Sequence, residues 1–415
     1  MPLGFANNIF TSSTTTAGAD WSAWDGSSDS TITVSELTNG SNYGRWLGFC
    51  DFNDDYGLAF GIENQSGGTN DDIVYAKIQN SSDTLTYSGQ AVHIATSSST
   101  FSSENGAIVK TNGGNIYASF NVGSSGRIYS ISGSTVTQHT AFTQTRSNPN
   151  YNRMFRQPGT DVYSNISGMA QGELVTLTDN GNSSSESTGT ETALRNSGSS
   201  GSGMYYWNNA NIIPGFVDKD TPIRLQSDPT PDSGAAGDTS LPVKLDLTST
   251  GTGQVEGTFA GLSAATFNLQ ASPTTSTIAW ITQATPPFPT TDFNDRMLFL
   301  ERDGGNDKIR MTNYKAGDTS YSQYTLTDSD IPGSDSQCCG IFVGSNNTIF
   351  LFNILDIPNN KIWIFRYNTS TNVIEKIIGI DHGEAFNQEK IRFCRWGNDR
   401  AVLMYNDNKI RLLVP

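Results

Sequence analysis

GIFVGSNNTIFLFNILDIPNNKIWIFRYNTSTNVIEKI, residues 340–377, contains four short apolar stretches separated by turn-forming residues. The stretches are Gly340–Val343, Thr348–Ile354, Lys361–Arg366 and Val373–Ile377. Each has the length and the β-branched and aromatic content of a strand, and the Asn, Asp, Gly and Pro residues between them favour turns. The segment therefore predicts a small antiparallel sheet of four consecutive strands.

The same order of strands and turns recurs along the chain. New units begin near Arg45, Gly106, Asn152, Met204, Ala265, Cys339 and Ile391. Diverged recurrence of this kind is typical of a β-propeller, a ring of small antiparallel sheets called blades, although some intervals exceed the usual repeat of about 40–50 residues. The sequence predicts an all-β propeller with seven blades. Six or eight blades also fit, because residues 241–259 could form an irregular blade.

The two ends of the chain complement each other. The last unit has three predicted strands between residues 391 and 414, and an incomplete sheet would expose an apolar edge. Residues 31–37, TITVSEL, alternate as a strand does and can fill that place. We therefore expect an N-terminal strand to complete the last blade and to close the ring. The residues expected at this closure are Ile32, Val34, Ile410 and Leu412.

Residues 1–30 precede the propeller domain, which is expected to occupy residues 31–415. They are rich in Ser, Thr, Gly and Asp, with isolated aromatic residues. Such a segment is too polar to form its own core, so we expect an extended arm that orders on a neighbouring protein or on the disc. Within the propeller, residues 183–203 predict a flexible loop and residues 227–261 an insertion. The aromatic residues expected to contact a neighbour are Phe5, Phe10, Trp21 and Trp24.

The chain is acidic, with 25 Lys and Arg against 40 Asp and Glu and a net charge of −15. This balance argues against nucleic acid or an anionic membrane as the main partner, since both require a basic surface. The last 27 residues reverse the trend, and Arg392 and Arg395 are candidate contacts for an acidic partner. No secretion signal or membrane span is evident, and four cysteines in so long a chain indicate no disulfide framework. Synthesis in a reducing cytoplasm is expected.

Motifs that carry chemistry are missing, so we predict no catalytic, cofactor or metal residues. The three histidines lie far apart in sequence and have no metal-ligand spacing. Asp51–Gly57 places oxygens at alternate positions as calcium loops do, but its glycine falls one residue late and no Glu follows at the required distance, so a turn is expected. The repeated Ser-x-Asp-x-Gly-x-Thr-Trp turn of sialidases is absent, although a carboxylate pair could still meet.

The chain resembles virion proteins of tailed bacteriophages. The resemblance lies in Ser-, Thr-, Asn- and Gly-rich strands, the polar N-terminal arm, the acidic β-rich body and the absent secretion signal. It implies a non-enzymatic structural protein, made in the host cytoplasm and located in the virion, at the tail nozzle or tip or on the particle surface. Its partners would be other virion proteins and copies of itself, without sequence-specific nucleic acid binding.

Two other functions fit the same pattern. A propeller that binds a host receptor or a glycan, as an adhesin does, could use polar tips such as residues 183–203 and 229–241 as recognition loops. A glycoside hydrolase or lyase is the third alternative.

Overall fold

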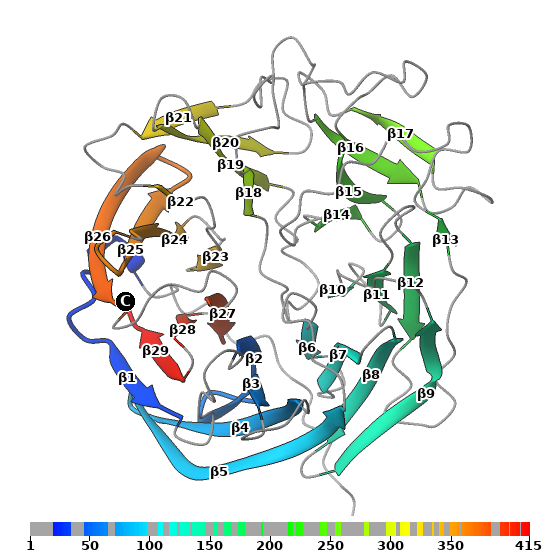
Figure 1. Cartoon of the computed structure of the whole chain (residues 1–415). Helices are drawn as coiled ribbons and strands as arrows, with labels where there is room; N and C mark the ends of the chain where they lie inside the picture. The colour runs from blue at the N-terminus through cyan, green and yellow to red at the C-terminus, as the bar shows by residue number, and fades with distance from the viewer. Residues whose placement is uncertain are drawn as a thin grey trace, which may run out of the picture.

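The computed structural model is an all-β structure (Figure 1). It describes residues 20–34, 45–64 and 71–97, the strands between residues 107 and 335 whose bounds are given below, and most of residues 340–415. Within these residues the only helical piece is the 3-10 turn η1 (Trp21–Ala23). The described part of the chain contains no helix long and apolar enough to cross a membrane.

The described strands fall into seven antiparallel sheets. The first sheet comprises β2 (Arg45–Asp51), β3 (Tyr56–Asn64), β4 (Asp71–Ser81) and β5 (Thr84–Ser97). The second comprises β6 (Ala107–Lys110), β7 (Ile116–Val122), β8 (Ser125–Ser132) and β9 (Thr135–Thr145). The third comprises β10 (Arg153–Arg156), β11 (Val162–Ser167), β12 (Glu173–Thr178) and β13 (Thr192–Ala193). The fourth comprises β14 (Gly215–Asp218), β15 (Thr221–Gln226), β16 (Leu241–Asp246) and β17 (Gln254–Thr258).

The remaining three sheets contain the later strands and one early strand. The fifth comprises β18 (Ile278–Ile281), β19 (Arg296–Asp303), β20 (Lys308–Lys315) and β21 (Ser322–Leu326). The sixth comprises β22 (Ser334–Asp335), β23 (Gly340–Val343), β24 (Ile349–Asp356), β25 (Lys361–Asn368) and β26 (Val373–Asp381). The last sheet comprises β27 (Arg392–Trp396), β28 (Arg400–Tyr405), β29 (Lys409–Leu413) and, from the other end of the chain, β1 (Ser30–Thr33).

The sheets follow one another around a ring in chain order (Figure 1). The strands nearest the centre are β2, β6, β10, β14, β18, β23 and β27. Strand β2 contacts β6 on one side and β27 on the other, and β27 also contacts β23. Five of the sheets are local meanders of four consecutive antiparallel strands. In the sixth sheet β22 and β23 both pair with β24, and in the last sheet β1 comes from the other end of the chain. This arrangement of small radial sheets is a β-propeller, as predicted.

Strand β1 occupies the outer side of the last sheet. It pairs antiparallel with β29, with Ser30 opposite Leu412 and Ile32 opposite Ile410. One more hydrogen bond, from Val34 N to Asn408 O at 2.8 Å, continues the pairing. The observed strand covers residues 30–33 instead of the expected 31–37, and residues 35–37 lie outside the described residues.

The last sheet is buried on both faces. Successive side chains of a strand point to opposite sides, so each strand contributes side chains to both faces. In β28, Ala401, Leu403 and Tyr405 pack toward the sixth sheet, whereas Val402 and Met404 pack toward the first sheet. We call the interface with the sixth sheet the terminal seam and the interface with the first sheet the first–last seam. Each seam is a separate cluster of buried apolar side chains.

Two predicted connections contain strands. Residues 241–258, predicted to belong to an insertion, supply β16 and β17 of the fourth sheet. Within the predicted loop 183–203, Thr192–Ala193 form β13 and pair with β12. The short β13 and the polar composition around it explain why no strand was predicted there, since two residues give no readable alternation.

Candidate functional site

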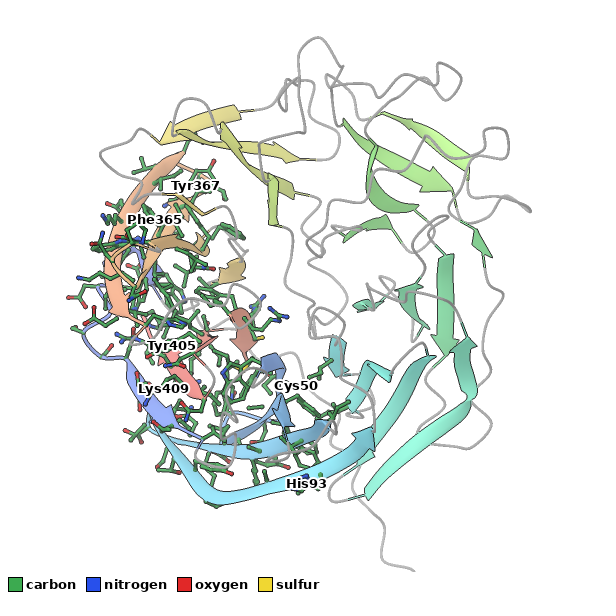
Figure 2. The ribbon with its side chains drawn as sticks, viewed as in Figure 1. Cys50, His93, Phe365, Tyr367, Tyr405 and Lys409 are labelled. Carbon is green, nitrogen blue, oxygen red and sulfur yellow. The ribbon has the colours of Figure 1, made fainter. Side chains whose placement is uncertain are left out.

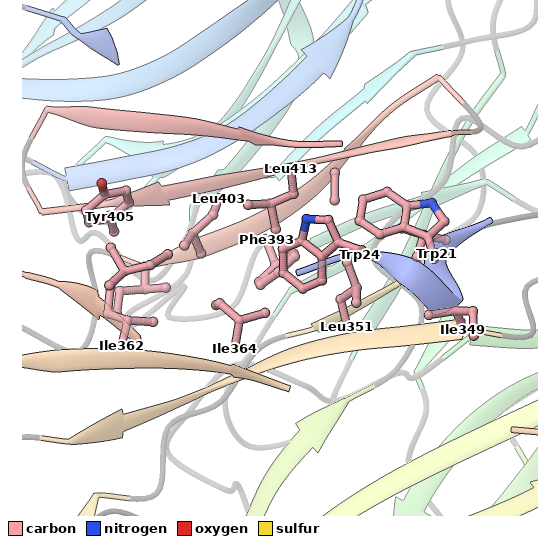
Figure 3. Packing of buried hydrophobic residues seen from close by; sticks show 14 of the residues in the cluster. Trp21, Trp24, Ile349, Leu351, Ile362, Ile364, Phe393, Leu403, Tyr405 and Leu413 are labelled. Atoms are coloured by element: carbon pink, nitrogen blue, oxygen red, sulfur yellow. The ribbon is translucent and has the colours of Figure 1, made fainter. Parts of the chain in front are cut away.

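The two ends of the chain meet where β1 pairs with β29, beside Lys409 (Figure 2), and this junction is the candidate functional site. The N-terminal segment, defined as residues 20–34, begins with η1, whose N-cap Asp20 accepts a hydrogen bond from Ser22 N at 2.9 Å. Trp21 and Trp24 follow and are 1% and 3% exposed. Their ring centroids lie 5.6 Å apart, edge to face. Figure 3 shows both indoles packed among side chains of the sixth and last sheets, including Leu351 and Phe393.

Arg366 on β25 holds the turn that carries the two tryptophans. One terminal nitrogen of its guanidinium donates to Trp21 O at 2.6 Å and to Trp24 O at 3.0 Å. Its Nε donates to Glu375 Oε2 at 3.1 Å, and the pair forms a salt bridge. Only 9% of the Arg366 side chain is exposed. The buried guanidinium is therefore satisfied by backbone carbonyls and one carboxylate, as a buried cation requires.

Asp29 joins the N-terminal segment to the end of the chain. Its Oδ1 accepts hydrogen bonds from Trp24 Nε1 at 3.1 Å and from Val414 N at 3.0 Å, and its Oδ2 accepts one from Arg411 Nε at 3.1 Å. None of the Asp29 side chain is exposed. Burial raises the pKa of this carboxyl above its ordinary value, and the hydrogen bonds and the Arg411 charge oppose that rise.

Gly26 permits close contact between the backbone of the N-terminal segment and Ile378 of the sixth sheet. Its φ is +79°, a conformation that residues with a side chain rarely adopt. A Cβ at this position would also lie 2.6 Å from Ile378 Cδ1. Arg411 donates to Gly26 O at 3.2 Å, so the same arginine contacts both Asp29 and the glycine turn.

The four residues expected at ring closure lie together in the first–last seam. Val34, Ile410 and Leu412 are fully buried there, and Ile32 packs against them from the edge. Ile32 belongs to β1, Val34 follows directly after it, and Ile410 and Leu412 belong to β29, which pairs with β1. Alternation places them on one face, because each is separated from its neighbour on the same strand by one residue.

The first–last seam also contains hydrogen bonds between the two sheets. Trp396 Nε1 donates to Asn53 O at 2.8 Å, and Gly397 N donates to Asp51 Oδ2 at 3.0 Å. On the rim, Arg400 pairs with Asp83. Leu85 N donates to Ser30 Oγ at 3.1 Å, so β1 contacts the first sheet as well as the last.

Asp51–Gly57 forms the expected turn between β2 and β3. Asn53 Oδ1 accepts hydrogen bonds from Asp55 N and Tyr56 N, as an Asx turn does. The carbonyls of Asp54 and Asp55 accept from the side chain and the backbone of Asn80. Within the described ranges, no group of three or more His, Cys, Asp or Glu residues is placed to hold a metal ion.

The residues expected to contact neighbouring proteins have different positions in the structure. Phe5 and Phe10 lie outside the described residues. Trp21 and Trp24 are buried inside their own chain, so the expectation that they contact a neighbour is wrong. The reason is that the sixth and last sheets leave an apolar space that the two indoles fill.

The two arginines of β27 are not a basic surface either. Arg395 is 7% exposed, and burial lowers its pKa to about 10, although the charges of Asp51 and Asp399 oppose the shift. The expectation that Arg395 contacts a partner is therefore wrong. Arg392 is half-buried and donates to the carbonyl of Ile391 at 2.9 Å.

Sequence reasoning missed Arg366 and Asp29, although they organise the junction. Arg366 interrupts the apolar run of β25, and a charged residue inside a strand buried on both faces signals a specific partner. Asp29 gave no such signal, because it sits in a polar segment where carboxylates are common. Only the fold shows that it is buried against residues 380 positions away.

Comparisons with known proteins support the fold. No protein-family model and no curated protein sequence matches the chain. Virginiamycin B lyase from Staphylococcus aureus is similar in structure over 93% of this chain and 99% of that chain, with a TM-score of 0.50 and 13% identity. A Lactobacillus plantarum protein matches over 85% and 92%, with a TM-score of 0.49 and 11% identity. The WD40 domain of SCAP from fission yeast matches over 93% and 98%, with a TM-score of 0.42 and 8% identity. The likeness to virginiamycin B lyase, at 13% identity, is one of fold alone.

Proposed function

We propose that the chain is a non-enzymatic structural protein of a phage-like virion, located in the tail or on the particle surface. In this proposal it is a seven-bladed propeller whose ring is closed by β1, and residues 1–19 form an arm that anchors the disc to neighbouring proteins. The observation that carries the proposal is the attachment of residues 20–34 to the sixth and last sheets through Trp21, Trp24 and Asp29.

A fixed attachment point is what an anchoring arm requires. Because residues 20–34 are buried against two sheets, any force on residues 1–19 is transmitted to the body of the propeller. The net charge of −15 suits a surface past which DNA must move without adhering, since like charges repel. The rings of Phe52 and Tyr56 stack at the turn between β2 and β3. The Lys77 ammonium lies over the Tyr56 ring, 4.0 Å from its centroid.

The test is to locate the protein in particles. Virions are purified from the source culture on a density gradient and labelled with gold-coupled antibodies against the chain. We expect gold at one fixed place on tailed particles and the chain among the virion proteins by mass spectrometry. Purified tailed particles that lack the chain would overturn the proposal.

A deletion separates the arm from the body. Removal of residues 1–19 leaves Trp21, Trp24 and Asp29 in place, so the propeller should fold while incorporation into particles is lost. Removal of residues 1–29 serves as the contrasting variant, because it also removes the buried contacts of the terminal seam and should lower the stability of the body itself.

A further inference from the structure

Strand β5 forms an unusual part of the rim. It is the outermost strand of the first sheet, and β4 is the only strand that pairs with it in the described part of the chain. Its 14 residues, TLTYSGQAVHIATS, include no Asp, Glu, Lys, Arg or Pro, although 16% of the whole chain is charged. Natural proteins usually place charges or proline on exposed edges, since an open edge can pair with another strand.

Among the residues that the structure describes, only the beginning of this edge is covered. Leu85 N, which points away from β4, donates to Ser30 Oγ, so β1 occupies that end. From Thr86 to Ser97, no described strand pairs with the outer side of β5. Val92, in the middle of this stretch, is 42% exposed, and it is one of two large apolar side chains that are exposed among the described residues.

The outer strand of the sixth sheet is the opposite case. Strand β26 carries Glu375, Lys376 and Asp381 along its nine residues. Glu375 and Asp381 also form salt bridges to β25. Pairing of another strand with this edge would require the charges to lose water. The β5 edge carries no charge, and it is interrupted by two bulges, one between Tyr87 and Ala91 and one between His93 and Ala95.

The arm has the composition that the open edge requires. Residues 1–19, MPLGFANNIFTSSTTTAGA, contain no charged side chain. Residues 9–16, IFTSSTTT, are rich in β-branched residues, which favour strands. Two copies that each carry a charge of −15 repel each other, and contact costs least where both surfaces are uncharged. Nineteen extended residues reach at most about 65 Å, which is enough to leave the parent disc.

We propose that residues 5–16 of one copy add as a strand to the outer edge of β5, residues 86–97, of a second copy. The partner at this rim is therefore the same chain, and copies are linked head to tail. The inference rests on the proposed function, because it specifies what the anchoring arm binds. Strand addition gains main-chain hydrogen bonds along the paired segments, which are about 40 Å long for twelve extended residues. The exposed Val92 gives the added strand an apolar contact.

The experiment uses the full-length chain in three variants and measures self-association by sedimentation velocity over a range of concentrations. Val92→Glu places a charge on the β5 edge. Val373→Glu is the matched control, because Val373 is 46% exposed on β26 and lies outside the proposed contact. The arm variant carries Ser12→Pro and Thr15→Pro, which remove an N–H donor from each side of the arm, whichever side faces β5.

Wild type and Val373→Glu should form larger species as concentration rises, and the other two variants should stay monomeric. An equimolar mixture of Val92→Glu with the arm variant should form a complex of two copies and no larger species, since one partner has only an intact arm and the other only an intact edge. Circular dichroism checks that each variant keeps the β-sheet spectrum of wild type.

Three outcomes would overturn the inference: monomeric wild type throughout, assembly of Val92→Glu equal to wild type, or a mixture that stays monomeric. Binding of the arm to β5 of its own copy would appear as the first of these. The result is distinguishable from that of the virion test. Gold-labelled particles with a monomeric pure protein would contradict only the inference, whereas self-association without labelled particles would contradict only the proposed function.

Discussion

The two seams of the last sheet bury similar apolar side chains but differ in their charged groups. In the terminal seam, the Asp29 side chain is 0% exposed and that of Arg366 is 9% exposed. In the first–last seam, the Arg400 and Asp83 side chains are 26% and 36% exposed. A buried charge that loses its partner is costly, whereas an exposed ion pair contributes little. The terminal seam therefore depends on buried charged groups, whereas the exposed ion pair of the first–last seam should contribute little.

The largest effect is expected for Trp24→Ala in the terminal seam. The substitution empties a buried site and removes one of the donors to Asp29, so the free energy of unfolding should fall by about 3–5 kcal/mol. Urea denaturation followed by tryptophan fluorescence and circular dichroism measures this loss. Trp396→Ala in the first–last seam, also fully buried, should cost a similar amount. An unchanged midpoint for Trp24→Ala would show that the N-terminal segment is not part of the cooperative structure.

Asp29→Ala should reduce stability by about 3 kcal/mol, because Trp24 Nε1, Val414 N and Arg411 Nε all lose their acceptor. Asp25→Ala is the matched control in the same segment. The Asp25 carboxylate is exposed and accepts hydrogen bonds from Ser27, so its loss should lower the free energy of unfolding far less than the loss of Asp29 does. Equal losses for the two variants would contradict the difference drawn between buried and exposed carboxylates.

Ile32→Ala tests the apolar contact between β1 and the last sheet. Ile32 is only half-buried in the first–last seam, so we expect a loss of about 1–2 kcal/mol, well below that of a fully buried isoleucine. Thr33→Ala, on the exposed face of the same strand, should stay within about 0.5 kcal/mol of wild type. If both variants matched wild type in denaturation, β1 would contribute nothing to the sheet.

Asp83→Asn tests the ion pair at the rim of the first–last seam. Asn tolerates the φ of +63° at this position, so the substitution removes the charge without straining the turn. We expect a loss below about 1 kcal/mol that decreases further in high salt. A loss as large as that of Asp29→Ala would mean that both seams depend on their charges alike.

The smallest expected effect is a pH dependence centred on Asp29. Its pKa is raised in the folded protein above the ordinary value of 3.8, so the native state holds this proton more tightly than the unfolded state does. This group therefore adds stability as the pH falls from neutral through the raised folded value toward 3.8. The stability deficit of Asp29→Asn relative to wild type should grow over that interval, as measured by denaturation at several pH values. A deficit that shrinks on acidification would contradict the raised pKa.

The periodicity of the sequence identified the class of fold. Short apolar runs bounded by turn-forming residues, such as residues 361–366 and 401–405, predicted strands, and those strands are present as β25 and β28. The prediction of an all-β propeller with antiparallel sheets is confirmed. Blade count and ring closure stay predictions, supported by the pairing of β1 with β29.

The position of single side chains was predicted less well. Trp21 and Trp24 lie in a polar stretch without alternation, so no local pattern distinguishes a tryptophan that fills its own core from one that contacts a neighbour. Arg395 was taken for a surface residue because it carries a charge, yet β27 is the inner strand of its sheet and both of its faces are covered.

The sequence by itself determined that the chain forms many short antiparallel strands, because a repeat of two residues depends only on neighbours along the chain. It also indicated that residues from the two ends belong together, since one end lacks a strand and the other supplies one. Tertiary structure alone decided that Asp29, Arg366 and the two N-terminal tryptophans join those ends. The N-terminal segment is buried against two sheets that lie hundreds of residues further along the chain, and this burial gives these side chains their partners.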